Sequence, residues 1–404
     1  MALRTEKVYI GYDLGESYSQ ISYCFLPTAQ SESEPETLPG AIGSDRFLIP
    51  TVLCKMPGEN RWTFGQDALR CAGDGGILVD HLFESSLAGE STEIEDTPYD
   101  SIALLSLFVK RSLSLLQFAI PAVKISAILF TVRRLNDMQR QVLEQITQSL
   151  ELKGCMYDYM EYQESYFYYL QKQPKELLLQ ECLLCDYLDE TVYAYHMIGN
   201  DRTVPKVNFV EEETYESGDL LENLKSMVEG RVINTVYLIG EPYESDAMKE
   251  VLRYLCAGRR VFQGTNLFSK GACYALLARH ANTPQNAVFL GREVVKANIG
   301  LRVKERGKLT YLALIDAGVP WREVGVERDI YLQDETQLPF MIAPVNGKTG
   351  RVAVLSIENK APIRRISIRL YMTDASTLCI ECKDLGFGEF EPSPGRIYRE
   401  FIEL

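Results

Sequence analysis

The 404-residue sequence has few of the side chains that build metal centres. Its three histidines, His81, His196 and His280, have no partner at the spacing of a known motif. Among ten cysteines, two pairs have the two-residue spacing of zinc sites: Cys182 with Cys185, and Cys379 with Cys382. Both pairs lie in apolar, strand-like runs, where residues three apart point to opposite faces. We therefore expect no structural metal, and reduced, mostly buried thiols.

Long apolar runs are also lacking. No window of about 18 residues is uninterruptedly apolar, so we expect no membrane span. The charged residues Arg4, Glu6 and Lys7 precede the first apolar strand, which does not fit a secretory signal. The sequence therefore predicts a cytoplasmic protein.

Positive charge is scarce in most of the chain. The net charge is −14 at pH 7, and residues 289–404 are nearly neutral, with 17 Lys and Arg against 16 Asp and Glu. The first 288 residues therefore carry 25 Lys and Arg against 40 Asp and Glu. Because an acidic surface repels phosphate backbones, we expect no nucleic-acid partner.

What the chain does contain is a change of pattern near residue 288. Strand-like and helix-like segments alternate before it, which is typical of an α/β sheet. After it the chain is strand-rich, with turns expected at residues 305–307, 346–347 and 384–386. We predict two domains, 1–288 and 289–404, the second all-β.

Three strand-to-turn segments stand out in the first domain. The apolar run from Val8 ends in Asp13-Leu14-Gly15, where a glycine lets backbone N–H groups approach a phosphate and an aspartate can face magnesium. Residues 126–141 predict a strand and then a helix capped at Asn136 or Asp137. The apolar face expected for this helix comprises Met138, Val142, Ile146 and Leu150. Residues 236–242 form a third strand-to-glycine turn, at Gly240.

In this order the segments resemble the nucleotide-binding domain of the DnaK-type, seventy-kilodalton heat-shock chaperones. Residues 49–52 and 64–68 are similar to the start of that family's second subdomain, and residues 366–384 are similar to a hairpin of its substrate-binding β-sandwich. The resemblance implies an α/β, actin-like (ribonuclease H-like) domain of two lobes followed by a β-sandwich. It also implies ATP and magnesium as cofactors, and peptides as partners.

The chain departs from the family at both hairpins that would hold the phosphates. Asp13 and Gly15 remain in the first, but Glu16 and Ser17 stand where the family has hydroxyl residues. A carboxylate about 4 Å from a phosphate costs on the order of 4 kcal/mol at an effective dielectric constant near 20. In the second hairpin Asp186 and Thr191 remain. The family's three glycine positions there are occupied by Leu188, Asp189 and Glu190.

Other positions also argue against ATP chemistry. The family's catalytic lysine corresponds to Leu69, next to Arg70, and Glu164 is followed by aromatic residues instead of alanines. Rings such as Tyr162 are expected either to fill the cleft or to pack on the sheet. About fifty residues separate Asp186 from Gly240, where the family inserts a whole subdomain. We therefore predict that the second lobe lacks its upper subdomain, and with it half of the adenine clamp.

In the β-domain, the resemblance and the basic loops point to a peptide site. Its candidate residues are Arg306, Lys308, Asn346 and Lys348. No helical lid is expected after the sandwich, so a bound peptide would exchange quickly.

Our main hypothesis is a degenerate chaperone-like protein without ATPase activity, cofactor or metal, which binds proteins or peptides or acts as a scaffold. One alternative is an ATP-binding chaperone with slow hydrolysis. Asp13, Glu164 and Asp186 would then hold magnesium and its waters, with Asp13 and Asp186 nearest the ion. The nucleotide contacts in that case would come from Gly15, Ser17, Thr191 and Gly240. The other alternative is an actin-like filament or cell-structure protein.

Overall fold

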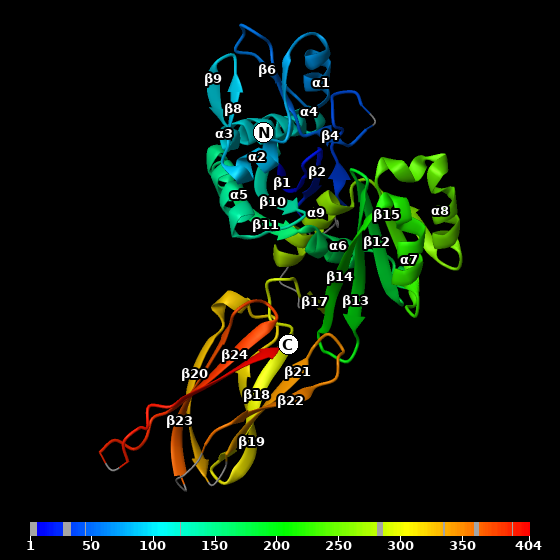
Figure 1. Cartoon of the computed structure of the whole chain (residues 1–404). Coiled ribbons are helices and arrows are strands. Elements are labelled where there is room, and N and C mark those ends of the chain that lie inside the picture. The colour runs from blue at the N-terminus through cyan, green and yellow to red at the C-terminus, as the bar shows by residue number, and fades with distance from the viewer. Residues whose placement is uncertain are drawn as a thin grey trace. The chain divides into compact units, whose positions relative to one another are not determined.

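The computed structural model describes residues 6–26, 34–44, 46–121, 123–280, 286–333, 336–358, 363–389 and 391–404. The chain divides into two compact units (Figure 1). Unit 1 comprises Met1–Met197 and Glu211–Pro284, and unit 2 comprises Ile198–Val210 and Gln285–Leu404. The main break thus lies close to the boundary predicted after residue 288. The predicted domains differ from the units in Ile198–Val210, which groups with unit 2.

The first sheet of unit 1 has the strand order β11-β10-β1-β2-β3. Strands β1 (Glu6–Leu14) and β2 (Tyr18–Phe25) form an antiparallel hairpin, and β3 (Glu36–Thr37) and β4 (Ile49–Pro50) pair with β2. Strands β10 (Val123–Val132) and β11 (Met156–Glu161) add in parallel on the other side of β1. β1 and β10 are buried along most of their length, as expected for central strands covered on both faces.

The second sheet repeats this order. Strands β12 (Glu181–Leu188), β13 (Thr191–Asn200) and β14 (Lys206–Glu216) are neighbours, and β15 (Ile233–Ile239) and β16 (Arg260–Gln263) add in parallel beyond β12. In unit 2, the first residues of β14 pair in parallel with β17 (Ala287–Phe289). The two sheets therefore share one topology, a duplication that the sequence does not show as a repeat.

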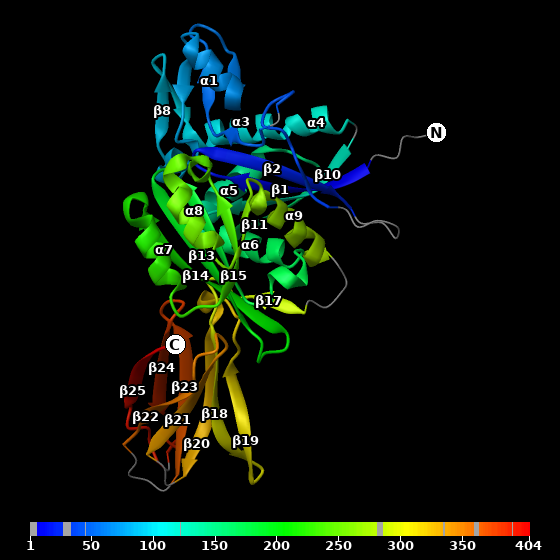
Figure 2. The same ribbon diagram turned by 90° about the vertical axis from the view of Figure 1, so that its right-hand side faces the viewer.

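Helices cover one face of each sheet with apolar side chains. On the first sheet they are α3 (Ser101–Leu113) and α5 (Asp137–Ser149), and on the second α7 (Leu220–Val228) and α8 (Lys249–Cys256) (Figure 2). α5 begins with the predicted Asn136 cap, which forms a reciprocal capping box with Gln139. Val142 and Ile146 are buried as expected, but Met138 is 56% exposed because it lies in the first turn, at the edge of the apolar face.

The opposite faces of the sheets are covered by α6 (Tyr162–Leu170) and α9 (Leu267–His280). α9 packs on β1 and β10, whereas Tyr166 and Tyr169 of α6 contact the Tyr237 ring of β15. The two helices touch at Gly271, where an added Cβ would lie 2.2 Å from the Ser165 carbonyl oxygen. A glycine is required here because the two backbones approach too closely for any side chain.

The two halves of unit 1 differ in what is inserted. The first half carries a subdomain between β4 and β10 that contributes the following elements: β5 (Leu53–Lys55), β6 (Trp62–Phe64), α1 (Gly65–Gly73), β7 (Ile77–Val79), α2 (Leu82–Ala88), β8 (Ser91–Ile94), β9 (Thr97–Asp100), α3 and α4 (Leu115–Ala119). In the second half, one short 3-10 turn and α7 connect β14 to β15. The short spacing between Asp186 and Gly240 therefore leaves room for no comparable subdomain.

One helical stretch among the described residues is long and apolar enough to span a membrane, by length and composition alone. It is Ser101–Ala119, and half of its most apolar window is buried. Leu104, Leu105 and Phe108 of this stretch pack in the core formed with the first sheet. The stretch is therefore accounted for as a core helix of unit 1.

Unit 2 is a sandwich of two four-stranded sheets. One has the order β19-β18-β21-β22, with β18 (Ala297–Glu305), β19 (Lys308–Ile315), β21 (Gln337–Pro344) and β22 (Arg351–Ser356). The other has the order β20-β23-β24-β25, with β20 (Gly325–Gln333), β23 (Ile363–Met372), β24 (Thr377–Asp384) and β25 (Ile397–Glu403). The core between them includes Ile299, Phe340, Ile368 and Ile380. The predicted hairpin of residues 366–384 is formed by β23 and β24.

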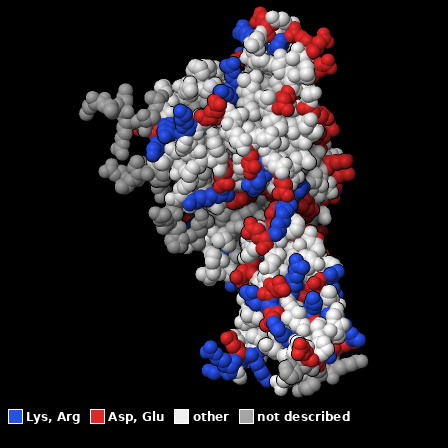
Figure 3. Space-filling view, turned by 90° about the vertical axis from the view of Figure 1, so that its left-hand side faces the viewer, with Lys and Arg blue, Asp and Glu red and all other residues white. Residues whose placement is uncertain are grey.

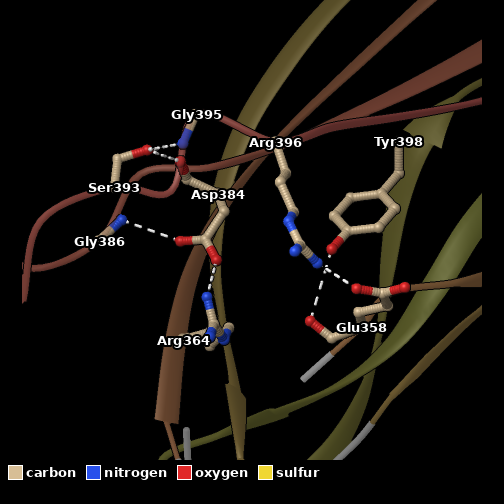
Figure 4. Close-up of polar contacts among 8 residues, drawn as sticks. All are labelled: Glu358, Arg364, Asp384, Gly386, Ser393, Gly395, Arg396 and Tyr398. Atoms are coloured by element: carbon tan, nitrogen blue, oxygen red, sulfur yellow. Dashed lines mark hydrogen bonds and ion pairs between the residues drawn. The ribbon is translucent and has the colours of Figure 1, made fainter. Parts of the chain in front are cut away.

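A polar cluster around the buried Asp384 lies where the chain leaves β24 (Figure 4). Asp384, which is 2% exposed, pairs with Arg364 and accepts a hydrogen bond from the Gly386 backbone N–H at 3.0 Å. The Ser393 hydroxyl donates to the Asp384 carbonyl oxygen and accepts from the Gly395 N–H. Since the described polar groups of this cluster partner one another, we assign it a structural role.

The ten cysteines all lie within the described residues and form no disulfide, and seven of them are buried. Cys185 lies in the core beneath α7 and α8, whereas the Cys182 thiol is directed to the Leu177 carbonyl oxygen, so this pair is split between two environments.

On the face of the molecule shown in Figure 3, basic side chains are interspersed with acidic ones.

Candidate functional site

A cleft of about 570 Å³ opens in unit 1 where the two sheets present equivalent strand ends. It is lined by the β1–β2 hairpin, the β12–β13 hairpin, the residues after β10 and β15, and α2 and α9. This volume is typical of a small-molecule site.

The cleft contains five of the seven residues that the sequence singled out for nucleotide or magnesium. They are Asp13, Gly15, Ser17, Asp186 and Gly240. Glu164 and Thr191 are not among the lining residues. α6 directs Glu164 toward α9 instead, where its carboxylate pairs with Arg279 at 2.7 Å. Because its carboxylate does not face the cleft, the structure gives no support to the magnesium role considered for Glu164.

Asp13 is buried behind an aromatic side chain. Its Oδ1 accepts a 2.6 Å hydrogen bond from the Tyr162 hydroxyl, and the Tyr162 ring stacks on Phe268 with centroids 3.9 Å apart. Burial raises the pKa of Asp13 to about 7; the Tyr162 hydrogen bond and Arg133 oppose this rise, and the nearby Asp186 adds to it. Tyr162 thus fills the space in front of Asp13, which was one of the two positions expected for its ring.

Asp186 is held by an arginine. The Arg133 Nη2 donates to its Oδ2 at 2.8 Å, and Nη1 donates to the Tyr195 hydroxyl at 2.9 Å. The guanidinium also lies over the Tyr193 ring, 3.8 Å from its centroid. Burial raises the pKa of Asp186 and Arg133 lowers it. A protein cation therefore lies beside the carboxylate where the alternative hypothesis requires magnesium.

The two hairpin turns contact each other. The Ser17 hydroxyl donates to Asp189 Oδ2 at 3.2 Å, and this bond joins the two halves of unit 1 across the cleft. Asp189 and Glu190 adopt positive φ values of 46° and 64°, a conformation that favours glycine. The turn thus keeps a glycine-like backbone although carboxylate side chains occupy two of the predicted glycine positions.

Gly240 has a packing role. Its φ is 122°, and an added Cβ would lie 2.5 Å from the Tyr187 carbonyl oxygen of β12. The residue is therefore required for close contact between neighbouring strands, independently of any purine.

The described residues that line the cleft include six acids and two bases. The acids are Asp13, Glu16, Asp186, Asp189, Glu241 and Glu244, and the bases are Arg133 and Arg134. Such an excess of carboxylates disfavours a triphosphate. The sequence patterns predicted the acids of both hairpins but assigned no role to Arg133, Phe268 or Gln20, because the place of these side chains in the cleft depends on contacts between distant segments.

The four residues proposed for peptide binding do not form one site. Arg306 lies in the β18–β19 turn and Lys308 begins β19, whereas Asn346 and Lys348 follow β21. The end of β21 pairs with the start of β18, so the two loops lie at opposite ends of the nine-residue strand β18. At about 3.3 Å per residue they are roughly 25 Å apart.

A family model described as "Family of unknown function (DUF5716) C-terminal" matches residues 34–292. The chain belongs to this family. A second model, described as "Domain of unknown function (DUF8552)", matches residues 294–404. No curated protein matches the chain. The DUF5716 C-terminal region contains Arg133, Tyr162 and Asp186, whereas the β1–β2 hairpin with Asp13 precedes it.

Proposed function

We propose that the chain is a chaperone-like protein of actin-like fold that has no ATPase activity and acts by binding protein or peptide segments. The repeated sheet topology supports this fold, since each half contributes a hairpin with an aspartate to one cleft. The two-sheet sandwich of unit 2 supports the likeness to the chaperones' substrate-binding domain.

The absence of ATPase activity rests on one observation: both hairpin aspartates already have protein partners. Tyr162 donates to Asp13, and Arg133 is paired with Asp186. A nucleotide with its magnesium ion would have to displace an aromatic ring and a buried guanidinium, and would then meet the carboxylates of Glu16 and Asp189. Each of these steps costs energy that the phosphate contacts would have to offset, which supports the proposed absence of ATPase activity.

Titration calorimetry with Mg-ATP tests this half of the proposal. We expect no saturable heat at millimolar nucleotide, with circular dichroism on the same sample as a check that the protein is folded. Binding tighter than about 10 μM, or roughly −7 kcal/mol, would favour the alternative of an ATP-binding chaperone.

The binding half of the proposal is supported by an exposed sheet edge. β19 is an edge strand, and its residues 309–315 contain no charged residue and no proline. Leu309 is 67% exposed and Tyr311 is 46% exposed. Edge strands of this kind pair with extended segments of other chains unless charge or proline blocks them. Arg306 and Lys308, two of the residues predicted for peptide binding, lie at the start of this edge.

Substitution of this edge tests peptide binding. The probe is reduced, carboxymethylated lactalbumin, a permanently unfolded protein, and binding is followed by fluorescence anisotropy. We expect the double variant Leu309→Lys/Tyr311→Lys to bind at least about ten-fold more weakly, because edge lysines oppose strand addition.

The matched control is Val352→Lys/Val354→Lys on β22, the opposite edge of the same sheet, where the two valines are 57% and 44% exposed. It should bind within two-fold of the unsubstituted protein. Equal losses in both double variants, or no binding by the unsubstituted protein, would remove the peptide-binding half of the proposal.

We place this activity in the cytoplasm, among protein partners. Ten cysteines without a disulfide support a reducing compartment. The net charge of −14 supports protein partners over nucleic acid.

A further inference from the structure

Gln20 is a buried side chain of the cleft without a partner. It lies on β2 directly opposite Asp13 in the hairpin register, so the two side chains share one face of the sheet. Gln20 is 2% exposed and lines the cleft, yet neither its Nε2 nor its Oε1 has a hydrogen-bond partner among the described residues. Because buried amides are nearly always satisfied, this carboxamide indicates a missing ligand or ordered water.

Glu16, on the same hairpin, is oriented but incompletely satisfied. Its Oε2 accepts a 3.0 Å hydrogen bond from the Glu84 backbone N–H of α2. Its Oε1 is buried and has no hydrogen-bond partner, and the His81 ring nitrogen lies 3.8 Å away, beyond hydrogen-bond distance. The carboxylate is therefore fixed in place with one acceptor oxygen available.

The remaining surface of the cleft is largely apolar. Six apolar side chains contribute to its lining: Leu48, Phe83, Leu87, Leu188, Ile239 and Phe268. Asp13 and Asp186 are already partnered by Tyr162 and Arg133, whereas Gln20 and Glu16 Oε1 are buried polar groups of the lining without a hydrogen-bond partner among the described residues. Apolar walls with a few fixed acceptors are complementary to an apolar molecule that carries N–H donors and positive charge.

We propose that the cleft binds a small organic cation in place of a nucleotide. An amidine, guanidine or amine group of this ligand donates hydrogen bonds to Glu16 Oε1 and to the Gln20 carboxamide oxygen. The apolar part of the ligand packs against the leucine and phenylalanine side chains of the lining. This inference rests on the proposed loss of nucleotide binding, because both ligands would use the same space. The charge of the lining selects a cation over an anion of the same shape, since six of its eight ionisable acids and bases are carboxylates.

Three probes of nearly identical shape test the choice of charge: benzamidine, benzamide and benzoate, which are cationic, neutral and anionic at pH 7. Ligand-observed NMR titration of the full chain gives each dissociation constant. We expect benzamidine to bind with a dissociation constant below about 1 mM, which its size allows. Benzoate should bind at least ten-fold more weakly.

Two variants test the assigned groups. Glu16→Gln should weaken benzamidine at least ten-fold and leave benzamide within two-fold, because it removes charge but keeps the shape. Gln20→Leu should weaken both benzamidine and benzamide. The control is Glu93→Gln, an exposed carboxylate on β8 outside the cleft, which should change neither constant by more than two-fold.

The inference fails if benzoate binds as tightly as benzamidine, if none of the probes binds, or if both cleft variants leave the constants unchanged. Mg-ATP titration of the same sample separates this failure from failure of the proposed function. Tight ATP binding overturns the proposed function, whereas absent benzamidine binding without ATP binding overturns this inference alone.

Discussion

Replacing Arg133 with methionine is expected to lower the free energy of unfolding by about 3 to 5 kcal/mol, because removal of one partner leaves a buried charge uncompensated. The Arg133 side chain is 22% exposed and that of Asp186 is 8% exposed, so water replaces little of the lost interaction. Methionine fills similar volume, which limits the contribution of a cavity. Urea denaturation at pH 7.5 measures the change.

The matched control is the neighbouring Arg134→Met. Arg134 also lines the cleft, but its side chain is 56% exposed and lies 3.4 Å from Glu212, so its loss should cost less than about 1 kcal/mol. The double variant Arg133→Met/Asp186→Asn should recover most of the stability lost in Arg133→Met, since the neutral amide needs no cation. An Arg133→Met effect as small as that of Arg134→Met would contradict our account of the cleft.

The sequence was sufficient for those parts of the site that are formed locally. The Asp13 and Asp186 hairpins, the Asn136 helix cap and the short connection before Gly240 each depend on residues close together in the chain. Strand, turn and cap preferences act over a few residues, so a single sequence contains their signal.

The partners of the two aspartates could not be predicted in the same way. Tyr162 is 149 residues from Asp13, and Arg133 is 53 residues from Asp186. Each contact exists because parallel strand order brings separate strand ends together, and no local pattern encodes that order. Glu164 shows the converse: it follows the expected motif position, but the direction of α6 turns its carboxylate toward Arg279.

Strand order also determines whether the two loops predicted for peptide binding lie together in unit 2. The turns at Arg306 and Asn346 were both predicted, and β18 and β19 pair as an antiparallel hairpin across the first of them. Whether the two turns meet depends on which end of β18 pairs with β21, a non-local choice. Because β21 is antiparallel to β18, its following loop lies at the start of β18 and away from Arg306.

We expect the charged form of Asp13 to destabilise the folded protein relative to its protonated form. Its pKa is raised by burial to about 7 in the folded protein, from an unfolded value near 3.8, so the folded state binds more protons between these values. This contribution favours folding at low pH and is lost as pH rises through 7. Asp13→Asn removes the dependence and keeps an oxygen acceptor for the Tyr162 hydroxyl.

The stability of Asp13→Asn relative to the unsubstituted protein should therefore increase by about 2 to 3 kcal/mol between pH 5 and pH 8. Urea denaturation across this range measures the difference, and the exposed Asp67→Asn is measured in parallel as a control for an amide substitution at the surface. With magnesium in the buffer, an aspartate that holds the ion would give the opposite sign, because the bound cation stabilises the charged carboxylate and the amide variant lacks this contribution as pH rises. Measured with magnesium present, the sign of the slope therefore distinguishes a buried Asp13 without a cation from an Asp13 that holds magnesium.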